Sequence, residues 1–258
     1  MPYRWLMSLL FVMCWGSLSE PLRGEDQSHS HQPTFQTIVE TETTAKLLAI
    51  LLDSGRNVVN ENQHLINDPE KGDKGFTPEI FEQQLMEIFW QRSGINLQEL
   101  GEEHIPEQAM ALLPKLVEMS KQVIDEGQTE INQKGLGFKG FIPAVFGARV
   151  AGRFFAATDV LLGQRALVPR NPSNLPDPFE RAALLEFADL AYPKEKIISE
   201  VAADNHWLRL MLPLYTTRGC LDCHGQPKGE LDKTGYPREG LQLGQNAGGI
   251  SVLIPVQE

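Results

Sequence analysis

The chain has 258 residues, 41% of them hydrophobic, so it can bury a core, and we expect one main domain with extensions. Its formal net charge is −11, and no block of Lys or Arg interrupts this acidic composition. Binding to nucleic acid or to an anionic membrane needs a basic surface, so the charge argues against both partners.

The first 24 residues have the three parts of a secretory signal peptide. Arg4 precedes an apolar run from Trp5 to about Leu18, and small residues follow. The run is too short for a membrane-spanning helix, so we interpret residues 1–24 as a signal peptide with its cleavage region. This predicts an exported, for example periplasmic, protein with no stable membrane span after cleavage. Lipidation of Cys14 and a buried N-terminal helix are the alternatives.

A polar leader and a long helix follow. Residues 25–34 lack hydrophobic periodicity and are predicted to be a flexible leader, although His29 and His31 within it leave metal binding as an alternative. Residues 35–258 are predicted to form the main domain. Its first segment, 35–62, contains no Pro and repeats apolar residues near helical spacing, which predicts one long amphipathic helix.

Further helices are predicted after a loop at 66–79 that is dense in Asp, Gly and Pro. Thr77 as N-cap and Gly94 as stop signal bound the second helix. A third helix covers 105–126, and we expect Pro114 to kink or restart it.

The middle of the chain mixes glycines with phenylalanines between residues 134 and 155. Its first half is interpreted as a loop against an apolar surface, which either closes the core or forms the apolar wall of a cofactor site. Residues 144–157 are predicted to be helical. Another helix begins after Asp177, where Asp177 and Glu180 form a capping box.

The C-terminal part has strand periodicity. Segments 197–204 and 205–216 are predicted to pair about a two-residue turn at Asp204–Asn205, and 248–257 supplies a closing strand. Helices followed by antiparallel strands indicate an α+β fold.

The segment CLDCH combines two cysteines and a histidine between the last two predicted strands. Cys220 and Cys223 are the only cysteines beyond the first 14 residues, and His224 follows directly. This spacing lets two thiols reach the two vinyl groups of one porphyrin, while the histidine is delivered to the iron as proximal ligand. The pattern predicts one covalently attached haem c per chain.

Two other uses of this segment are less consistent with the sequence. A thioredoxin-like site needs its CxxC pair at a helix N-terminus within a βαβ pattern and has no use for the histidine. A structural zinc site needs further ligands, usually from a second CxxC or HxxxH pair, and the sequence has none.

Four stretches resemble the family of PAS-like c-type haem domains found in exported bacterial sensor proteins. They are NQHLINDPEKGDKGFT at 62–77, GFIPAVFGARV at 140–150, RNPSNLPDPFE at 170–180 and CLDCHG at 220–225. The resemblance implies a PAS-like antiparallel sheet with flanking helices and a long N-terminal helix, covalent haem c, and a sensory or redox role in the periplasm. It also implies two kinds of partner: the haem-maturation machinery, and a redox or signalling protein.

The ligand on the far side of the iron is not decided by the sequence. Relatives in this family often carry a cysteine on the first long helix, but none lies between the signal peptide and Cys220 here. His64 is the leading candidate, and an open distal side is the alternative. His206 and Met211 precede Cys220 on a predicted strand, so His206 starts on the order of 45 Å away at about 3.3 Å per residue. His104 is interpreted as a solvated loop residue.

Two residues of the RNPSNLPDPFE stretch could bind haem propionates. Arg170 suits a carboxylate geometrically, and Asn171 follows it. The alternative is that both brace the loop ahead of the next helix. We find no acid/base pair, Ser/His/Asp pattern or phosphate loop and expect no enzyme activity.

Three functions therefore remain open after the sequence. The first is a haem protein that senses redox state or a small ligand. The second is a small electron-transfer cytochrome. The third is a haem-free thiol-disulfide protein.

Overall fold

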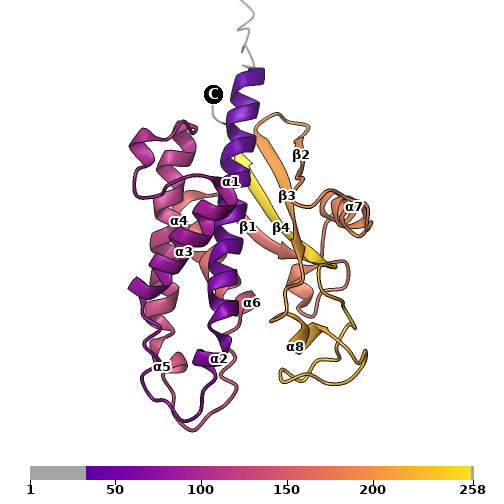
Figure 1. Cartoon of the computed structure of the whole chain (residues 1–258). Coiled ribbons are helices and arrows are strands. Elements are labelled where there is room, and N and C mark those ends of the chain that lie inside the picture. Colours follow the sequence, from indigo (N-terminus) through magenta and orange to yellow (C-terminus); the bar gives the residue numbers. More distant parts are fainter. Residues whose placement is uncertain (1–32, 257–258) are drawn as a thin grey trace, which may run out of the picture. The chain divides into compact units, whose positions relative to one another are not determined.

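A four-stranded antiparallel sheet organises the computed structural model, which describes residues 33–256 (Figure 1). The predicted signal peptide and nearly all of the predicted leader lie outside these described residues. The strand order is β1-β4-β3-β2, so the two longest strands are central. Their bounds are β1 Leu161–Arg165, β2 Ile198–Val201, β3 Trp207–Tyr215 and β4 Asn246–Pro255.

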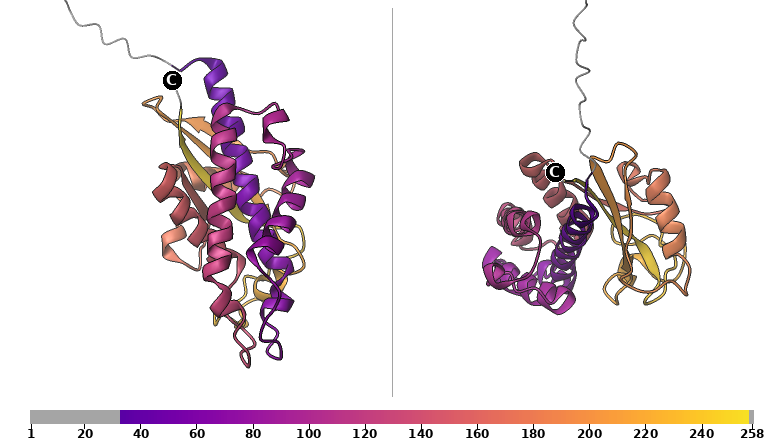
Figure 2. Two further views of the ribbon diagram at one scale, coloured as in Figure 1. Left: turned by 90° about the vertical axis from the view of Figure 1, so that its left-hand side faces the viewer. Right: turned by 90° about the horizontal axis from the view of Figure 1, so that it is seen from above.

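Helices cover both faces of the sheet, but unequally (Figure 2). On one face, α1 contacts β3 and β4 and α6 contacts β1, while α3 and α4 pack on α1. On the other face, α7 contacts β3 and β4. The long helices are α1 Phe35–Glu61, α3 Pro78–Ser93, α4 Glu107–Glu126, α6 Pro143–Thr158 and α7 Pro178–Phe187. The short helices are α2 Gln63–Ile66, α5 Gln128–Ile131 and α8 Leu221–His224, with 3-10 turns η1 Leu100–Glu102 and η2 Pro172–Asn174. The predicted α+β fold, with its long N-terminal helix, is confirmed.

The period-two alternation of β3 divides the core into two parts. Leu208, Leu210 and Leu212 face the helical layer and belong to the main core, which continues through α1. Met211, on the opposite face, packs with residues of α7 in a small second cluster. The strand is therefore buried on both sides, which explains its nearly continuous apolar sequence.

The long helix α1 is buried through most of its middle, between the sheet and the other helices. Thr34 caps it, since its hydroxyl accepts the N–H of Thr37 at 3.1 Å. Gly55 marks its close approach to α6, because a Cβ there would lie 2.9 Å from the buried ring of Phe146. Among residues 33–256, no helix is long and apolar enough to cross a membrane.

The structure differs from the sequence prediction at three places. Helix α4 runs through Pro114 as one element, so the helix does not restart there, while the alternative of a kink stays a prediction; Pro114 lies on the exposed face of the helix. Strands β2 and β3 pair as predicted, but residues 202–206 connect them, which is longer than a two-residue turn. Strand β1 was not predicted, because the preceding helix ends at Asp159 in a left-handed conformation that glycine usually supplies.

Candidate functional site

The CLDCH segment lies in the connection between the two central strands, residues 216–245, at the end of the molecule that also holds α2 (Figure 1). Cys220 is the N-cap of α8, and its carbonyl accepts the N–H groups of Cys223 and His224 at 3.2 and 2.9 Å. Residues three apart in one helical turn share a face, so the two thiols emerge on the same side. Both cysteines are free of disulfide bonds and partly exposed.

The surroundings of the two thiols differ from those of a redox-active pair. The Cys220 sulfur lies 3.3 Å from the hydroxyl of Thr217. Burial raises the pKa of the Cys223 thiol, and the nearby charges do not reverse this effect. Reactive CxxC cysteines have lowered thiol pKa values, so the Cys223 environment does not favour thiolate chemistry.

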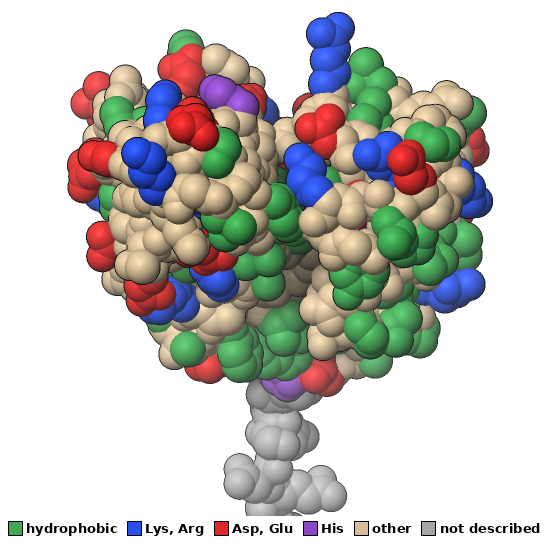
Figure 3. Space-filling view, turned by 90° about the horizontal axis from the view of Figure 1, so that it is seen from below, with side chains coloured by type: hydrophobic (Ala, Val, Ile, Leu, Met, Phe, Trp, Pro, Cys, Tyr) green, Lys and Arg blue, Asp and Glu red, His purple; other side chains and the backbone are tan. Residues whose placement is uncertain are grey.

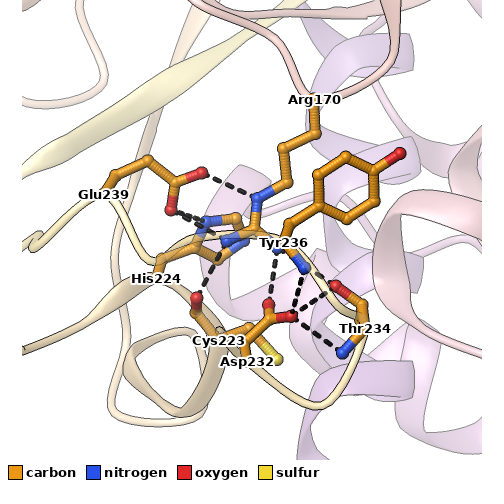
Figure 4. Close-up of polar contacts among 7 residues, drawn as sticks. All are labelled: Arg170, Cys223, His224, Asp232, Thr234, Tyr236 and Glu239. Carbon is orange, nitrogen blue, oxygen red and sulfur yellow. Dashed lines mark hydrogen bonds and ion pairs between the residues drawn. The ribbon is translucent and has the colours of Figure 1, made fainter. Parts of the chain in front are cut away.

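The imidazole of His224 is held by a carboxylate. Its Nδ1 lies 2.8 Å from Oε2 of Glu239, fifteen residues along the same connection (Figure 4). Burial alone would raise the pKa of Glu239, but hydrogen bonds from Arg170 and His224 outweigh burial and lower it. Glu239 is therefore an anion that accepts a hydrogen bond from Nδ1–H of His224. This leaves Nε2 of His224 as the nitrogen that can bind a metal.

Arg170 reaches the same carboxylate from the segment after β1 (Figure 4). Its Nε donates to Glu239 Oε1 at 2.7 Å, and its Nη2 donates to Glu239 Oε2 at 2.9 Å and to the Cys223 carbonyl at 2.8 Å. Its Nη1 donates to Asp232 Oδ2 at 2.6 Å and, at 3.4 Å, to the hydroxyl of Thr234. All five N–H donors of the guanidinium thus have protein acceptors. We call Arg170, Asp232, Glu239 and His224 the Arg170 cluster.

Asp232 anchors this cluster in the interior. Its side chain is fully buried, and Oδ1 accepts the N–H and hydroxyl of Thr234 at 2.7 and 2.6 Å and the N–H of Tyr236 at 3.2 Å. Burial would raise the pKa of Asp232, but the hydrogen bonds from Thr234 and Arg170 hold it well below its usual range. A buried carboxylate stays charged only when such partners satisfy it.

The C-terminal end of α1 touches the chain just before the cysteines. The side-chain amide of Asn60 donates to the hydroxyl of Thr217 at 3.1 Å, and a Cβ on Gly219 would lie 2.8 Å from the Asn60 side chain. Figure 3 shows a cleft on this end of the molecule, between the helical layer and the side that carries the β3–β4 connection, with hydrophobic side chains along its walls. The apolar walls of this cleft suit a flat apolar cofactor.

His64 follows α1 by one short turn, on α2. Its ring is exposed, and Nδ1 lies 3.0 Å from the carbonyl oxygen of Glu61. If Nδ1 donates to that carbonyl, Nε2 carries the free lone pair, which is the arrangement of a metal-binding histidine. Asn60, four residues earlier, contacts the CLDCH side, so His64 belongs to the same end of the molecule.

The other candidates from the sequence lie elsewhere. His206 lies in the β2–β3 connection, at the opposite end of β3 from Tyr215, and Met211 is buried against α7. His104 is exposed after η1.

The two residues predicted to bind propionates differ in position. Arg170 lies in the site, but protein acceptors occupy its donors, so its contacts do not support propionate pairing, which stays a prediction. Asn171 accepts the N–H of Ser173 at 3.0 Å and caps η2, a contact that braces the loop ahead of α7.

Three residues of the site were not identified from the sequence: Asn60, Asp232 and Glu239. Asn60 belongs to an ordinary helix end. The two acidic residues lie in a Gly- and Pro-rich passage whose conformation has no periodic signal. One signal could have identified Asp232 and Glu239: they are carboxylates that follow the CxxCH segment closely, and Arg170 is a cation that could pair with them.

The architecture and the site together define an α+β domain that presents a CxxCH segment between the central strands of an antiparallel sheet. The chain belongs to the Tll0287-like family, described as Tll0287, whose model matches residues 34–255. This confirms the family relationship expected from the sequence. A solved structure described as the crystal structure of the cyanobacterial heme-protein Tll0287 is 20% identical, covers 64% of this chain and 99% of that chain, and has a TM-score of 0.39. No curated protein matches the chain.

Proposed function

We propose that this chain is an exported protein that carries one haem c, attached through Cys220 and Cys223, with Nε2 of His224 as the proximal iron ligand. One observation carries the proposal: two free thiols share a face of α8 beside an imidazole whose Nδ1 is held at 2.8 Å by Glu239. Membership of a family named after Tll0287, which is described as a haem protein, supports haem as the ligand class.

The attachment reaction consumes only the two thiols and the two vinyl groups of the porphyrin. Each S–H adds across one vinyl group, so that a C–S bond forms, the vinyl double bond is consumed and the proton ends on the outer vinyl carbon. The protein mass therefore rises by that of one intact haem. Bound haem supplies one-electron Fe(III)/Fe(II) chemistry.

The residues around the thiols fit this cofactor. Arg170 fixes the Cys223 carbonyl and Glu239 orients His224, so protein contacts hold both residues in place. Asn60 holds the segment before Cys220 against α1.

We further propose that the protein senses redox state or a small ligand at the iron, and that it catalyses no reaction. The exposure of His64 supports this role, because a ligand held by a single local contact is easily displaced. The second candidate is an electron-transfer cytochrome, which requires a firmly held distal ligand, for which His64 is the leading candidate. A haem-free thiol-disulfide role is less favoured, because burial raises the pKa of the Cys223 thiol.

The deciding experiment is expression in an exporting host with a complete haem-maturation system. We expect a pyridine haemochrome spectrum and an intact mass of one haem per chain, both surviving denaturation. Cys220→Ala and Cys223→Ala should each retain one thioether with a shifted haemochrome maximum, and the double variant should release all haem on denaturation. A wild-type chain that is colourless at the mass of the apoprotein would refute the proposal.

Carbon monoxide separates the two haem-based roles. Rapid binding to the ferrous protein, with a large spectral change, supports a sensor with a labile distal side. A low-spin spectrum unchanged by CO supports the electron carrier.

A further inference from the structure

The most unusual feature of the Arg170 cluster is that one carboxylate oxygen is shared. Oε2 of Glu239 accepts from His224 Nδ1 at 2.8 Å and from Arg170 Nη2 at 2.9 Å, while Oε1 accepts from Arg170 Nε at 2.7 Å. The imidazole and the guanidinium therefore compete for the same negative charge.

We infer that Glu239 and Arg170 are positioning residues that tune the reduction potential of the haem iron in opposite directions, both acting through His224. The inference rests on the proposed function, because it assigns a regulation to that same site.

Glu239 makes His224 a stronger donor. An anionic partner on Nδ1 draws the ring proton toward itself and raises the electron density at Nε2. Strong donation from an axial ligand favours ferric over ferrous iron, so Glu239 lowers the reduction potential.

Arg170 weakens that effect. It donates to both oxygens of the carboxylate in a bidentate pair and so withdraws charge that would otherwise act on the imidazole. The guanidinium is also a fixed positive charge next to the ligand, which favours the ferrous state. Because Asp232 is fully buried and holds Nη1 at 2.6 Å, Arg170 cannot easily turn away from this position.

Solvent limits the size of both effects. The side chains of His224 and Glu239 are 38% and 34% exposed, so water screens part of the interaction. We therefore expect shifts of roughly tenfold in the ferrous-to-ferric ratio at a fixed ambient potential, about 59 mV for a one-electron couple.

Variants of the haem-loaded chain test the inference by spectroelectrochemical titration. Glu239→Gln should increase the ferrous-to-ferric ratio at fixed potential about tenfold. Arg170→Gln should decrease it by a similar factor. Because Arg170→Gln leaves Asp232 as a buried unpaired anion and could fold poorly, it is also made in the Asp232→Asn background and compared with Asp232→Asn alone.

The control is Glu82→Gln, which makes the same charge change at a comparably exposed glutamate that pairs with Lys121 on the α3–α4 side, away from the sheet. We expect less than a twofold change there. A pyridine haemochrome spectrum confirms attachment in every variant.

Opposite shifts in the two site variants support the inference, because mere loosening of the loop would move both potentials in the same direction. Shifts of the same sign, or no shift in haem-loaded variants, overturn it and leave the proposed function intact. A wild-type chain without covalent haem overturns both.

Discussion

Removing Arg170 should destabilise the fold measurably, and the structure indicates by how much. Arg170→Gln takes the counterion from Asp232, whose side chain is fully buried, and breaking a buried ion pair in this way costs about 3–5 kcal/mol. Asp232 keeps its hydrogen bonds from Thr234 and Tyr236, which reduce the cost. The lost pair with Glu239, one-third exposed, adds about 0–1 kcal/mol. We therefore expect the free energy of unfolding to fall by about 2–4 kcal/mol.

Urea unfolding of Arg170→Gln, Asp232→Asn and the double variant tests this expectation as a double-mutant cycle. The cost of the double variant should be smaller than the sum of the single costs by about 1 kcal/mol or more, since neither partner remains unpaired. Arg209→Gln is the control, because Arg209 pairs with Asp177 at a more exposed site and should cost less than about 1 kcal/mol. If Arg170→Gln costs no more than this control, or if the single costs simply add, Arg170 does not hold the connection in the way described.

Three further predictions concern other parts of the chain. His64→Ala should convert a six-coordinate haem to a high-spin form or accelerate CO binding, whereas His104→Ala should change neither. Identical spectra for the wild type, His64→Ala and His104→Ala would remove His64 as a ligand. Gly55→Ala should lower the free energy of unfolding by up to about 2 kcal/mol, because overpacking against a buried ring costs about 1–3 kcal/mol and the gain in helix propensity returns only about 1 kcal/mol. Gly152 lies on the exposed face of α6 with nothing near an added methyl, so Gly152→Ala should raise the free energy of unfolding by up to about 1 kcal/mol. A change of the same sign in Gly55→Ala and Gly152→Ala would contradict the packing argument. The pKa of Asp232 is lowered in the folded state, so its contribution to stability is complete above about pH 4 and is lost as the pH falls through the folded pKa. Between about pH 4 and 2 the free energy of unfolding should therefore fall less steeply with decreasing pH in Asp232→Asn than in the wild type. An unchanged slope would count against the ion pair.

The sequence predicted those parts of the fold that have a local physical signal. Thr77 and Asp177 are side-chain caps with proline at the next position, and the helices begin there. Strands β3 and β4 were predicted from apolar segments bounded by turn residues, as expected for strands at the centre of a sheet. Strand β1 escaped prediction because it has five residues, contains Gly163 and follows a helix that ends at an aspartate rather than a glycine.

The candidate site was predictable only where its chemistry is encoded in adjacent residues. Cys220, Cys223 and His224 form a contiguous pattern, so their spacing alone indicates a shared role. Glu239 and Asp232 act on that pattern across loops without periodicity, and no rule of spacing connects them to Arg170. Their roles depend on the tertiary path of the β3–β4 connection.

Arg170 was identified from the sequence as a residue of the site, but for a different reason from the one that the structure supports. The sequence showed an arginine suited to a carboxylate, and the structure supplies carboxylates from the protein itself: Asp232 and Glu239. The chain has a net charge of −11, so its carboxylates outnumber its cations, and an arginine can readily find carboxylate partners within the protein. The buried carboxylate of Asp232 fixes the guanidinium, and the carboxylate of Glu239, one-third exposed, acts on His224. The electronic state of the proposed iron ligand thus depends on a residue, Arg170, that lies 54 positions earlier in the chain.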